Sequence, residues 1–203
     1  VGIYIFGVDW LKETNATTWL IWVTSFTIIA SSIIALKKDN LKARLAFSTV
    51  SQLSYITLGL ALANAVGVLG SSFHILTHAF AKVTLFMCAG SIYVATKKTN
   101  VSQISGLGKK MPITFTAFLL ASLSIIGLPP LAGSWSKWML ILSAIESEQI
   151  VIVGVFLLSS LLNIAYLIPI VGKGFFDFSN KSEKFSIEGI QEAPTLCWMP
   201  SII

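Results

Sequence analysis

Long apolar runs separated by short polar loops dominate the chain. A helix needs about 20 apolar residues to cross the hydrocarbon core of a bilayer. The pattern predicts five membrane-spanning helices within residues 17–172, preceded at 1–16 by the end of another helix and a loop. Residues 173–203 are predicted to form a cytoplasmic loop and the start of a further helix. The predicted helices cover about residues 17–36, 45–63, 66–96, 113–145 and 150–171.

The run 113–145 is too long for one straight membrane helix, because a helix rises about 1.5 Å per residue. Two prolines in its middle remove two backbone donors and obstruct the preceding turn. We therefore expect one broken helix whose second half carries Ser134, Ser136 and Lys137. Two short helices joined at the prolines are a weaker alternative, since neither half spans comfortably alone. The residues expected to form the break are Gly127, Pro129, Pro130 and Gly133.

The run 66–96 contains three ionisable residues at intervals of four: His74, His78 and Lys82. At about 100° per residue they share one helix face. A lysine deep in a membrane helix costs about 2.5–3.5 kcal/mol on insertion scales, and such residues commonly mark ion or proton paths. A second lysine, Lys137, lies beside the predicted break.

This set of residues suits proton transfer. A lysine in a low-dielectric interior can exist in either protonation state near neutral pH. Histidine can take a proton on one nitrogen and release one from the other. A single membrane histidine more often serves helix–helix hydrogen bonding, but three residues on one face favour a relay of His74, His78, Lys82 and Lys137, with water filling the gaps.

Polar residues on other predicted helices can support such a path. The second helix carries a stripe at i, i+3, i+4 and i+7, which also fits plain helix–helix hydrogen bonding in lipid. The candidate supporting residues are Ser48, Gln52, Tyr55, Thr77 and Ser134, and the stripe also includes Ser51.

Composition and charge agree with this map. The chain is 55% hydrophobic and 11% charged, against about 25% charged in soluble domains. Its net charge of +5 does not indicate nucleic-acid binding, because the basic residues sit in short loops. Those loops, at 37–44, 97–110 and 173–184, fall on one predicted face, which the positive-inside rule makes cytoplasmic. We find no metal-ligand cluster, phosphate loop or nucleophile motif, and expect no metal and no cofactor.

The chain resembles the proton-translocating antiporter-like subunits of respiratory complex I and of Mrp-type sodium/proton antiporters. The resemblance rests on stretches that match in order and spacing across residues 17–172. They are Asp39–Tyr55, Phe73–Lys82, Gly106–Pro112 and Gly127–Lys137.

The resemblance implies inverted five-helix repeats, each with one broken helix, of which this chain is similar to the second. It implies that Lys82 is the central relay lysine and Lys137 the terminal one. The departures are Trp138, where some complex I members have an acid, and the absence of the first repeat. The segment Gly133–Trp138 and the loop 99–103 look more like the D-type subunit of Mrp antiporters.

Three functions follow as expectations. The first is a proton-conducting subunit of a multisubunit monovalent cation/proton antiporter, with protons and Na⁺ as transported ions. The second is a proton-pumping subunit of NADH–quinone oxidoreductase, which would make it part of a translocase although it has no catalytic chemistry of its own. The third is a non-transporting membrane scaffold. The expected partners are other membrane subunits and the lipid bilayer, in a bacterial inner membrane.

Overall fold

The computed structural model describes residues 16–176 and, before them, positions 5, 7, 10, 11 and 14. The predicted loop and further helix at 177–203, and most of the predicted segment 1–16, lie outside the described residues. The described part is helical, with one isolated β-bridge between Asn40 and Asn100.

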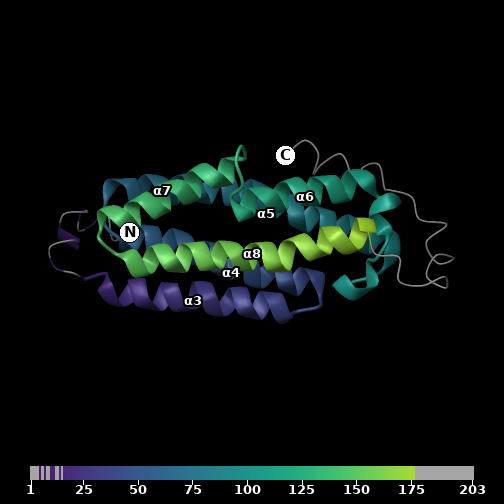
Figure 1. Cartoon of the computed structure of the whole chain (residues 1–203), viewed down its shortest axis with the longest axis horizontal. Helices are drawn as coiled ribbons and strands as arrows, with labels where there is room; N and C mark the ends of the chain where they lie inside the picture. The colour runs from purple at the N-terminus through teal and green to yellow at the C-terminus, as the bar shows by residue number, and fades with distance from the viewer. Residues whose placement is uncertain (1–4, 6, 8–9, 12–13, 15, 177–203) are drawn as a thin grey trace.

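The helices run back and forth along one long axis (Figure 1). Helices that follow one another in the chain run antiparallel, except α6 and α7, which run in the same direction. Two short 3₁₀ helices lie in the loop between α5 and α6. The elements are α3 Thr18–Lys37, α4 Leu41–Ala61, α5 Ala65–Thr96, η1 Val101–Gln103, η2 Leu107–Lys109, α6 Pro112–Ile126, α7 Ala132–Glu146 and α8 Ile150–Phe176.

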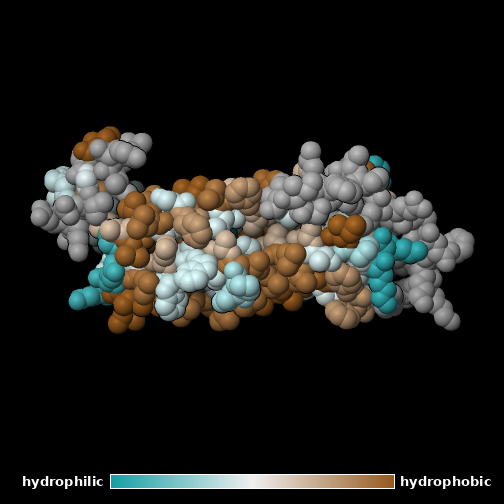
Figure 2. All heavy atoms as spheres, turned by 90° about the horizontal axis from the view of Figure 1, so that it is seen from above, coloured by the Kyte–Doolittle hydropathy of each residue, from teal (hydrophilic) through white to brown (hydrophobic). Residues whose placement is uncertain are grey.

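The surface fits a bilayer. Three helices, α3, α5 and α8, are long and apolar enough to cross a membrane. Large hydrophobic side chains such as Phe26 and Leu161 are exposed on the bundle. Hydrophilic residues gather at its two ends with hydrophobic surface between them (Figure 2). The protein is an all-helical integral membrane protein, as the sequence predicts.

The basic loops meet at one end of the bundle. Asp39, after α3, accepts hydrogen bonds from the backbone and hydroxyl of Ser102 in the α5–α6 loop. The backbone N–H of Gly106 donates to the carbonyl of Lys173, near the end of α8. Segments separated by two or more helices in sequence are therefore bonded to one another at this end.

At the opposite end, one asparagine joins the α4–α5 turn to α7. The Asn64 side chain accepts from the Gly67 backbone at 2.7 Å and from the Ser143 hydroxyl at 2.7 Å. Its amide donates to the Ser143 carbonyl and the Ser147 hydroxyl. Asn64 is thus both the N-cap of α5 and an anchor for the outer end of α7.

The break between α6 and α7 confirms the predicted discontinuous helix. Gly127 has φ +92°, a left-handed conformation that glycine adopts without a Cβ penalty. The backbone N–H of Leu128 returns to the carbonyl of Leu123 at 3.1 Å, as in a Schellman C-cap. Pro129 and Pro130 follow in the turn before α7. The two halves together span the bundle, and neither does so alone (Figure 1).

Helix α8 continues past the point where its sequence suggests an end. We expected Pro169 and Gly172 to end it, but it extends to Phe176 with Pro169 inside. A proline inside a helix removes one backbone hydrogen bond in the preceding turn. The buried guanidinium of Arg44 donates to the Tyr166 carbonyl in that turn at 3.2 Å, which ties α4 to this part of α8.

Cysteine labelling in an intact membrane tests the two-ended arrangement. A cysteine at Lys98 and a cysteine at Glu148 are expected to react with impermeant reagents from opposite sides, with Lys98 on the cytoplasmic side. Both positions lie in loops at opposite ends of the bundle. Lys38 lies in the loop bonded to residues 99–102 and is the matched control. A cysteine at Lys38 is expected to be labelled from the same side as one at Lys98. Labelling of positions 98 and 148 from the same side would contradict this topology.

Candidate functional site

The three ionisable residues of α5 all face the interior. His74 is 3% exposed, His78 7% and Lys82 5%. The two imidazole rings are stacked with centroids 6.1 Å apart. Spacing of four residues on one helix places each side chain one turn above the last. The structure therefore brings the predicted ladder together as a buried line.

Lys82 is held by neutral oxygens. Its Nζ donates to the Ser48 hydroxyl at 2.9 Å and to the Leu45 carbonyl at 3.1 Å, both on α4. The Tyr166 hydroxyl donates to the same Ser48 oxygen at 2.8 Å and also contacts the Asn163 side chain. The amine is thus hydrogen-bonded without a carboxylate, which leaves it able to carry or release a proton.

His74 joins three helices. Its Nε2 lies 3.2 Å from Gln52 Oε1 on α4, and its Nδ1 lies 2.8 Å from the Ser136 hydroxyl on α7. The ring also stacks on Tyr55, with centroids 5.8 Å apart. These contacts fix the ring between the polar stripe of α4 and the first turns of α7.

The protonation state of His74 depends on the direction in which the Ser136 hydroxyl donates its hydrogen. Ser136 also contacts the Gly133 carbonyl at 3.0 Å, and its hydroxyl has one hydrogen to give. If Ser136 donates to the Gly133 carbonyl, its oxygen can only accept from His74 Nδ1. Gln52 Oε1 likewise accepts from His74 Nε2, so both ring nitrogens carry a proton and the ring is cationic. A neutral ring requires Ser136 to turn toward His74 or the Gln52 amide to flip. Rotation of these side chains is therefore enough to switch the surroundings of His74 between those of a cationic and those of a neutral ring.

A small polar cavity lies beside His78. The space that the centre of a water molecule can occupy in it is about 10 Å³. The residues that line it include Gln52, His74, Thr77 and His78. Two buried nitrogens, His78 Nε2 and Gln52 Nε2, have no hydrogen-bond partner among the described residues. A cavity of this size holds about one water when polar partners surround it. Both nitrogens belong to residues that line the cavity.

Lys137 lies at the helix break. Its Nζ donates to the Ile126 carbonyl at 3.1 Å and to the Ser160 hydroxyl on α8 at 3.2 Å. It also lies 5.1 Å from the centre of the Tyr55 ring, a cation–π distance. Ile126 is the last residue of α6, where the helix dipole presents partial negative charge. The broken helix thus supplies Lys137 with a counter-charge without a carboxylate.

The four groups form an ordered sequence. Lys82 follows His78 by one turn of α5. The His74 ring stacks on the His78 ring, and Tyr55 contacts both the His74 ring and the Lys137 Nζ. Among the described residues, the acidic side chains Asp39, Glu146 and Glu148 stand at the ends of the bundle. The line from Lys82 through the histidines to Lys137 therefore consists of bases and neutral hydrogen-bonding groups.

Of the supporting residues predicted from sequence, all but Ser134 contact the buried line or line the small cavity beside it. Ser48, Gln52 and Tyr55 are fully buried and contact members of the line. Thr77 lines the small cavity, and its hydroxyl donates to the His74 carbonyl. Ser134 donates to the Leu131 carbonyl in its own turn, while Ser136 is the serine of α7 that reaches His74.

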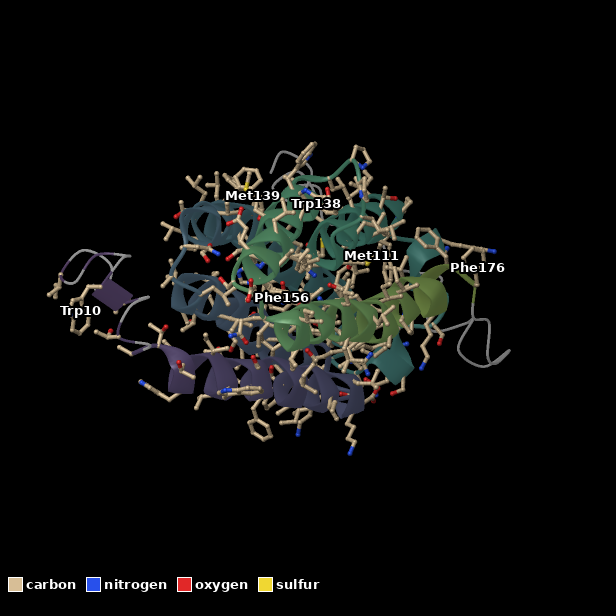
Figure 3. The ribbon with its side chains drawn as sticks, turned by 60° about the vertical axis from the view of Figure 1, so that its left-hand side comes forward. Trp10, Met111, Trp138, Met139, Phe156 and Phe176 are labelled. Atoms are coloured by element: carbon tan, nitrogen blue, oxygen red, sulfur yellow. The ribbon has the colours of Figure 1, made fainter. Side chains whose placement is uncertain are left out.

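Sequence reasoning missed the contribution of α8. Asn163 and Tyr166 are fully buried and connect to Lys82 through Ser48, and Ser160 contacts Lys137. Polar residues at i and i+3 in a strongly apolar helix are the signal that would have found the Asn163–Tyr166 pair. Figure 3 shows Phe156, also from α8, in the interior of the bundle, where its carbonyl accepts from the Tyr55 hydroxyl.

Within residues 16–176 and the described positions before them, no group of three or more His, Cys, Asp or Glu is placed to hold a metal ion. The chemistry that this set of residues offers is therefore proton exchange between nitrogen bases. Serine and tyrosine hydroxyls bridge neighbouring groups, and α4, α5, α7 and α8 each contribute at least one contact to the line.

One curated relative matches most of the chain. The chain is 40% identical over 154 residues to NADH-quinone oxidoreductase subunit N of Desulforudis audaxviator (strain MP104C). That alignment covers 76% of this chain but 31% of the relative. The chain thus spans less than a third of that relative's length.

Solved structures agree with the fold. The chain is similar to a chain of the Mrp complex from Dietzia sp. DQ12-45-1b, with a TM-score of 0.75 and 32% identity, over 78% of this chain and 30% of that one. A chain of respiratory complex I from Thermus thermophilus has the same fold, with a TM-score of 0.85 and 19% identity over 99% of this chain and 42% of that one. The model of the family described as "NADH:quinone oxidoreductase/Mrp antiporter, TM" matches residues 1–163. The chain therefore belongs to this family of antiporter-like membrane subunits.

Proposed function

We propose that the chain is the proton-conducting part of a subunit of a multisubunit monovalent cation/proton antiporter, similar to the D-type subunit of Mrp antiporters. Residues 17–172 form the conducting domain, with His74, His78, Lys82 and Lys137 as the relay. The other membrane subunits of the complex are its partners, and Na⁺ is the exchanged cation. The bacterial inner membrane is its location, with the basic end of the bundle facing the cytoplasm.

The observation that carries the proposal is the buried line itself. Two lysines and two histidines lie in the interior of an apolar bundle, and Lys82, His74 and Lys137 each bond a hydroxyl or carbonyl oxygen. Burying ionisable groups in a membrane is costly. A scaffold gains nothing from that cost, whereas a proton path requires groups that change charge.

The proposed transfer runs between Lys82 and Lys137. The Lys82 ammonium gives a proton toward His78 through the water site that His78 and Gln52 border. His78 passes it to His74, and rotation of the Ser136 hydroxyl lets His74 release it from its Nδ1 side. Lys137 receives the proton where the C-terminal end of α6 stabilises an ammonium group. Each step uses a lone pair on a named nitrogen, and the reverse steps move a proton the other way.

A second candidate, a membrane subunit of an NADH–quinone oxidoreductase, has a specific observation in its favour. The identity to subunit N, 40%, exceeds the 32% identity to the Mrp complex chain. The same relay would then be driven by redox chemistry in other subunits. Purification of the intact protein with its native partners separates the candidates. Dehydrogenase subunits in the purified complex would select the second, and their absence alongside other antiporter subunits the first.

Lys137→Gln in the intact protein is expected to reduce proton movement by about 100-fold, within the range that positioned proton-transfer groups contribute. Glutamine can still donate to the Ile126 carbonyl but cannot take up a proton. The measurement is proton uptake into vesicles, normalised to the amount of inserted protein. Lys37→Gln, at an exposed position at the end of α3, is the matched control and should leave uptake unchanged. Normal uptake in Lys137→Gln would refute its place in the relay.

Tyr166→Phe is expected to slow proton movement by about fivefold to tenfold. The change keeps the ring but removes the hydroxyl that bonds Ser48 and Asn163, and a single hydrogen bond contributes about 0.5–1.5 kcal/mol. Since Ser48 also holds Lys82, the loss is expected in the rate and not in the amount of inserted protein. Tyr93→Phe, outside this network on α5, is the control. An unchanged rate in Tyr166→Phe would remove Tyr166 from the path.

A further inference from the structure

A large apolar groove runs along the outside of the bundle between α5 and α6. Its volume is about 730 Å³, which lies in the range of ligand-binding pockets. Phe73 and Phe80 of α5 line it and are exposed. The small side chains Ala117 and Ala121 of α6 also line it and leave the space open.

The groove has the length and depth of one membrane leaflet. Along α6 it extends from Pro112 to Ser124, about 18 Å at 1.5 Å per residue. Half of a bilayer's hydrocarbon core is about 15 Å thick. One end of the groove lies beside the loop that carries basic residues, and the other lies at Ala132, the first residue after the helix break. The groove therefore extends from the membrane boundary to about the bilayer centre.

Positive charge stands at the boundary end. Lys109 and Lys110 directly precede Met111 and Pro112, and both lysines are exposed. Basic side chains at a membrane surface attract anionic lipid headgroups, by about 1 kcal/mol per residue. The charged end and the apolar groove thus match the two parts of an anionic phospholipid.

We propose that this groove binds one acyl chain of an anionic phospholipid from the leaflet at the basic end, with its phosphate beside Lys109 and Lys110. Lipid is favoured over a transmembrane helix because the exposed lysine pair at the boundary end complements a phosphate group. A single acyl chain is narrow enough to fill the space without displacing α5 or α6.

The acyl chain would also seal the proton path. Thr77 and Ser124 line both the groove and the small polar cavity beside His74 and His78. These two side chains therefore lie between the membrane interior and the buried line. A bound chain over them keeps the lateral side of the cavity apolar, so that water does not connect the line to the membrane surface along the groove.

Native mass spectrometry of the intact complex tests the proposal, with phosphatidylglycerol and phosphatidylcholine as the probes. The wild type is expected to retain phosphatidylglycerol about tenfold more than phosphatidylcholine. Ala117→Phe, which fills the groove, and Lys109→Ala with Lys110→Ala, which removes the charge, should each lose this retention. The controls are Leu157→Phe, on an exposed face of α8, and Lys37→Ala with Lys38→Ala, at the end of α3. Equal retention in the groove variants and their controls would overturn the proposal.

Photo-crosslinking in the otherwise wild-type protein gives an answer that does not depend on the folding of Ala117→Phe. A photoreactive phenylalanine at Leu120, which lines the groove and is 52% exposed, is expected to form an adduct with phospholipid. An adduct with a partner protein, a second copy or another segment of the same chain would show a protein occupant and overturn the lipid assignment. The same residue at Leu157 controls for general contact with the bilayer.

Discussion

Replacing Lys82 with alanine in the intact protein is expected to lower proton movement by about 100-fold or more, the range in which positioned proton-transfer groups act. Lys82 is the member of the line that connects α5 to Ser48 and, through it, to Tyr166. Alanine leaves no titratable nitrogen at this position. Lys82→Arg is not expected to restore the rate, because arginine stays protonated and cannot cycle.

Single replacements of the histidines are expected to be milder. His78→Ala enlarges the small cavity beside it, and additional water can bridge one missing step. We expect a loss of about tenfold or less. Lys42→Ala, at an exposed position that contacts Tyr93, serves as the matched lysine control. Proton movement at the wild-type rate in Lys82→Ala, with equal protein in the membrane, would refute the line as a proton path.

Gly133→Ala is expected to disable transport through the helix break without changing any titratable group. A Cβ at Gly133 would lie 1.8 Å from the carbonyl oxygen of Ser124 on α6, and a backbone atom cannot rotate away. Overpacking of this kind costs about 1–3 kcal/mol. The first turn of α7 must then move away from α6, which carries Lys137 away from the Ile126 carbonyl that it bonds at 3.1 Å.

The control for this change is another helical glycine. A Cβ at Gly154 of α8 meets nothing within 4 Å, so Gly154→Ala should leave stability and transport unchanged. The measurements are the thermal stability of the purified protein and proton uptake into vesicles. Full stability and full uptake in Gly133→Ala would show that the contact between the two half-helices is not required.

The helix break provides the carbonyl that holds Lys137. In a straight helix, the Ile126 carbonyl would bond within the helix and would not be available to Lys137. The break leaves this carbonyl free to accept from the ammonium group and places partial negative charge beside it. Discontinuity of the helix and the burial of Lys137 are thus one arrangement, in which the end of α6 takes the place of a carboxylate.

The sequence by itself determined the class of fold, the number of helices and the residues of the α5 ladder. Apolar runs of membrane length and two adjacent prolines are local features, and each acts within its own helix. Spacing of four residues likewise fixes His74, His78 and Lys82 on one face regardless of the surroundings. The alternating basic loops also placed the α3–α4 loop, the α5–α6 loop and the end of α8 at one end, which the hydrogen bonds of Asp39 and Gly106 confirm.

Only the tertiary structure decided which polar groups on other helices meet that ladder. Ser134 and Ser136 are equivalent by composition, but the rotation of α7 after the break turns Ser136 toward His74 and leaves Ser134 bonded to its own turn. Tyr166 reaches Ser48 because of how α8 packs beside α4, where Arg44 also donates to the Tyr166 carbonyl. Contacts of this kind depend on how helices far apart in sequence pack, and no pattern within one helix encodes that packing.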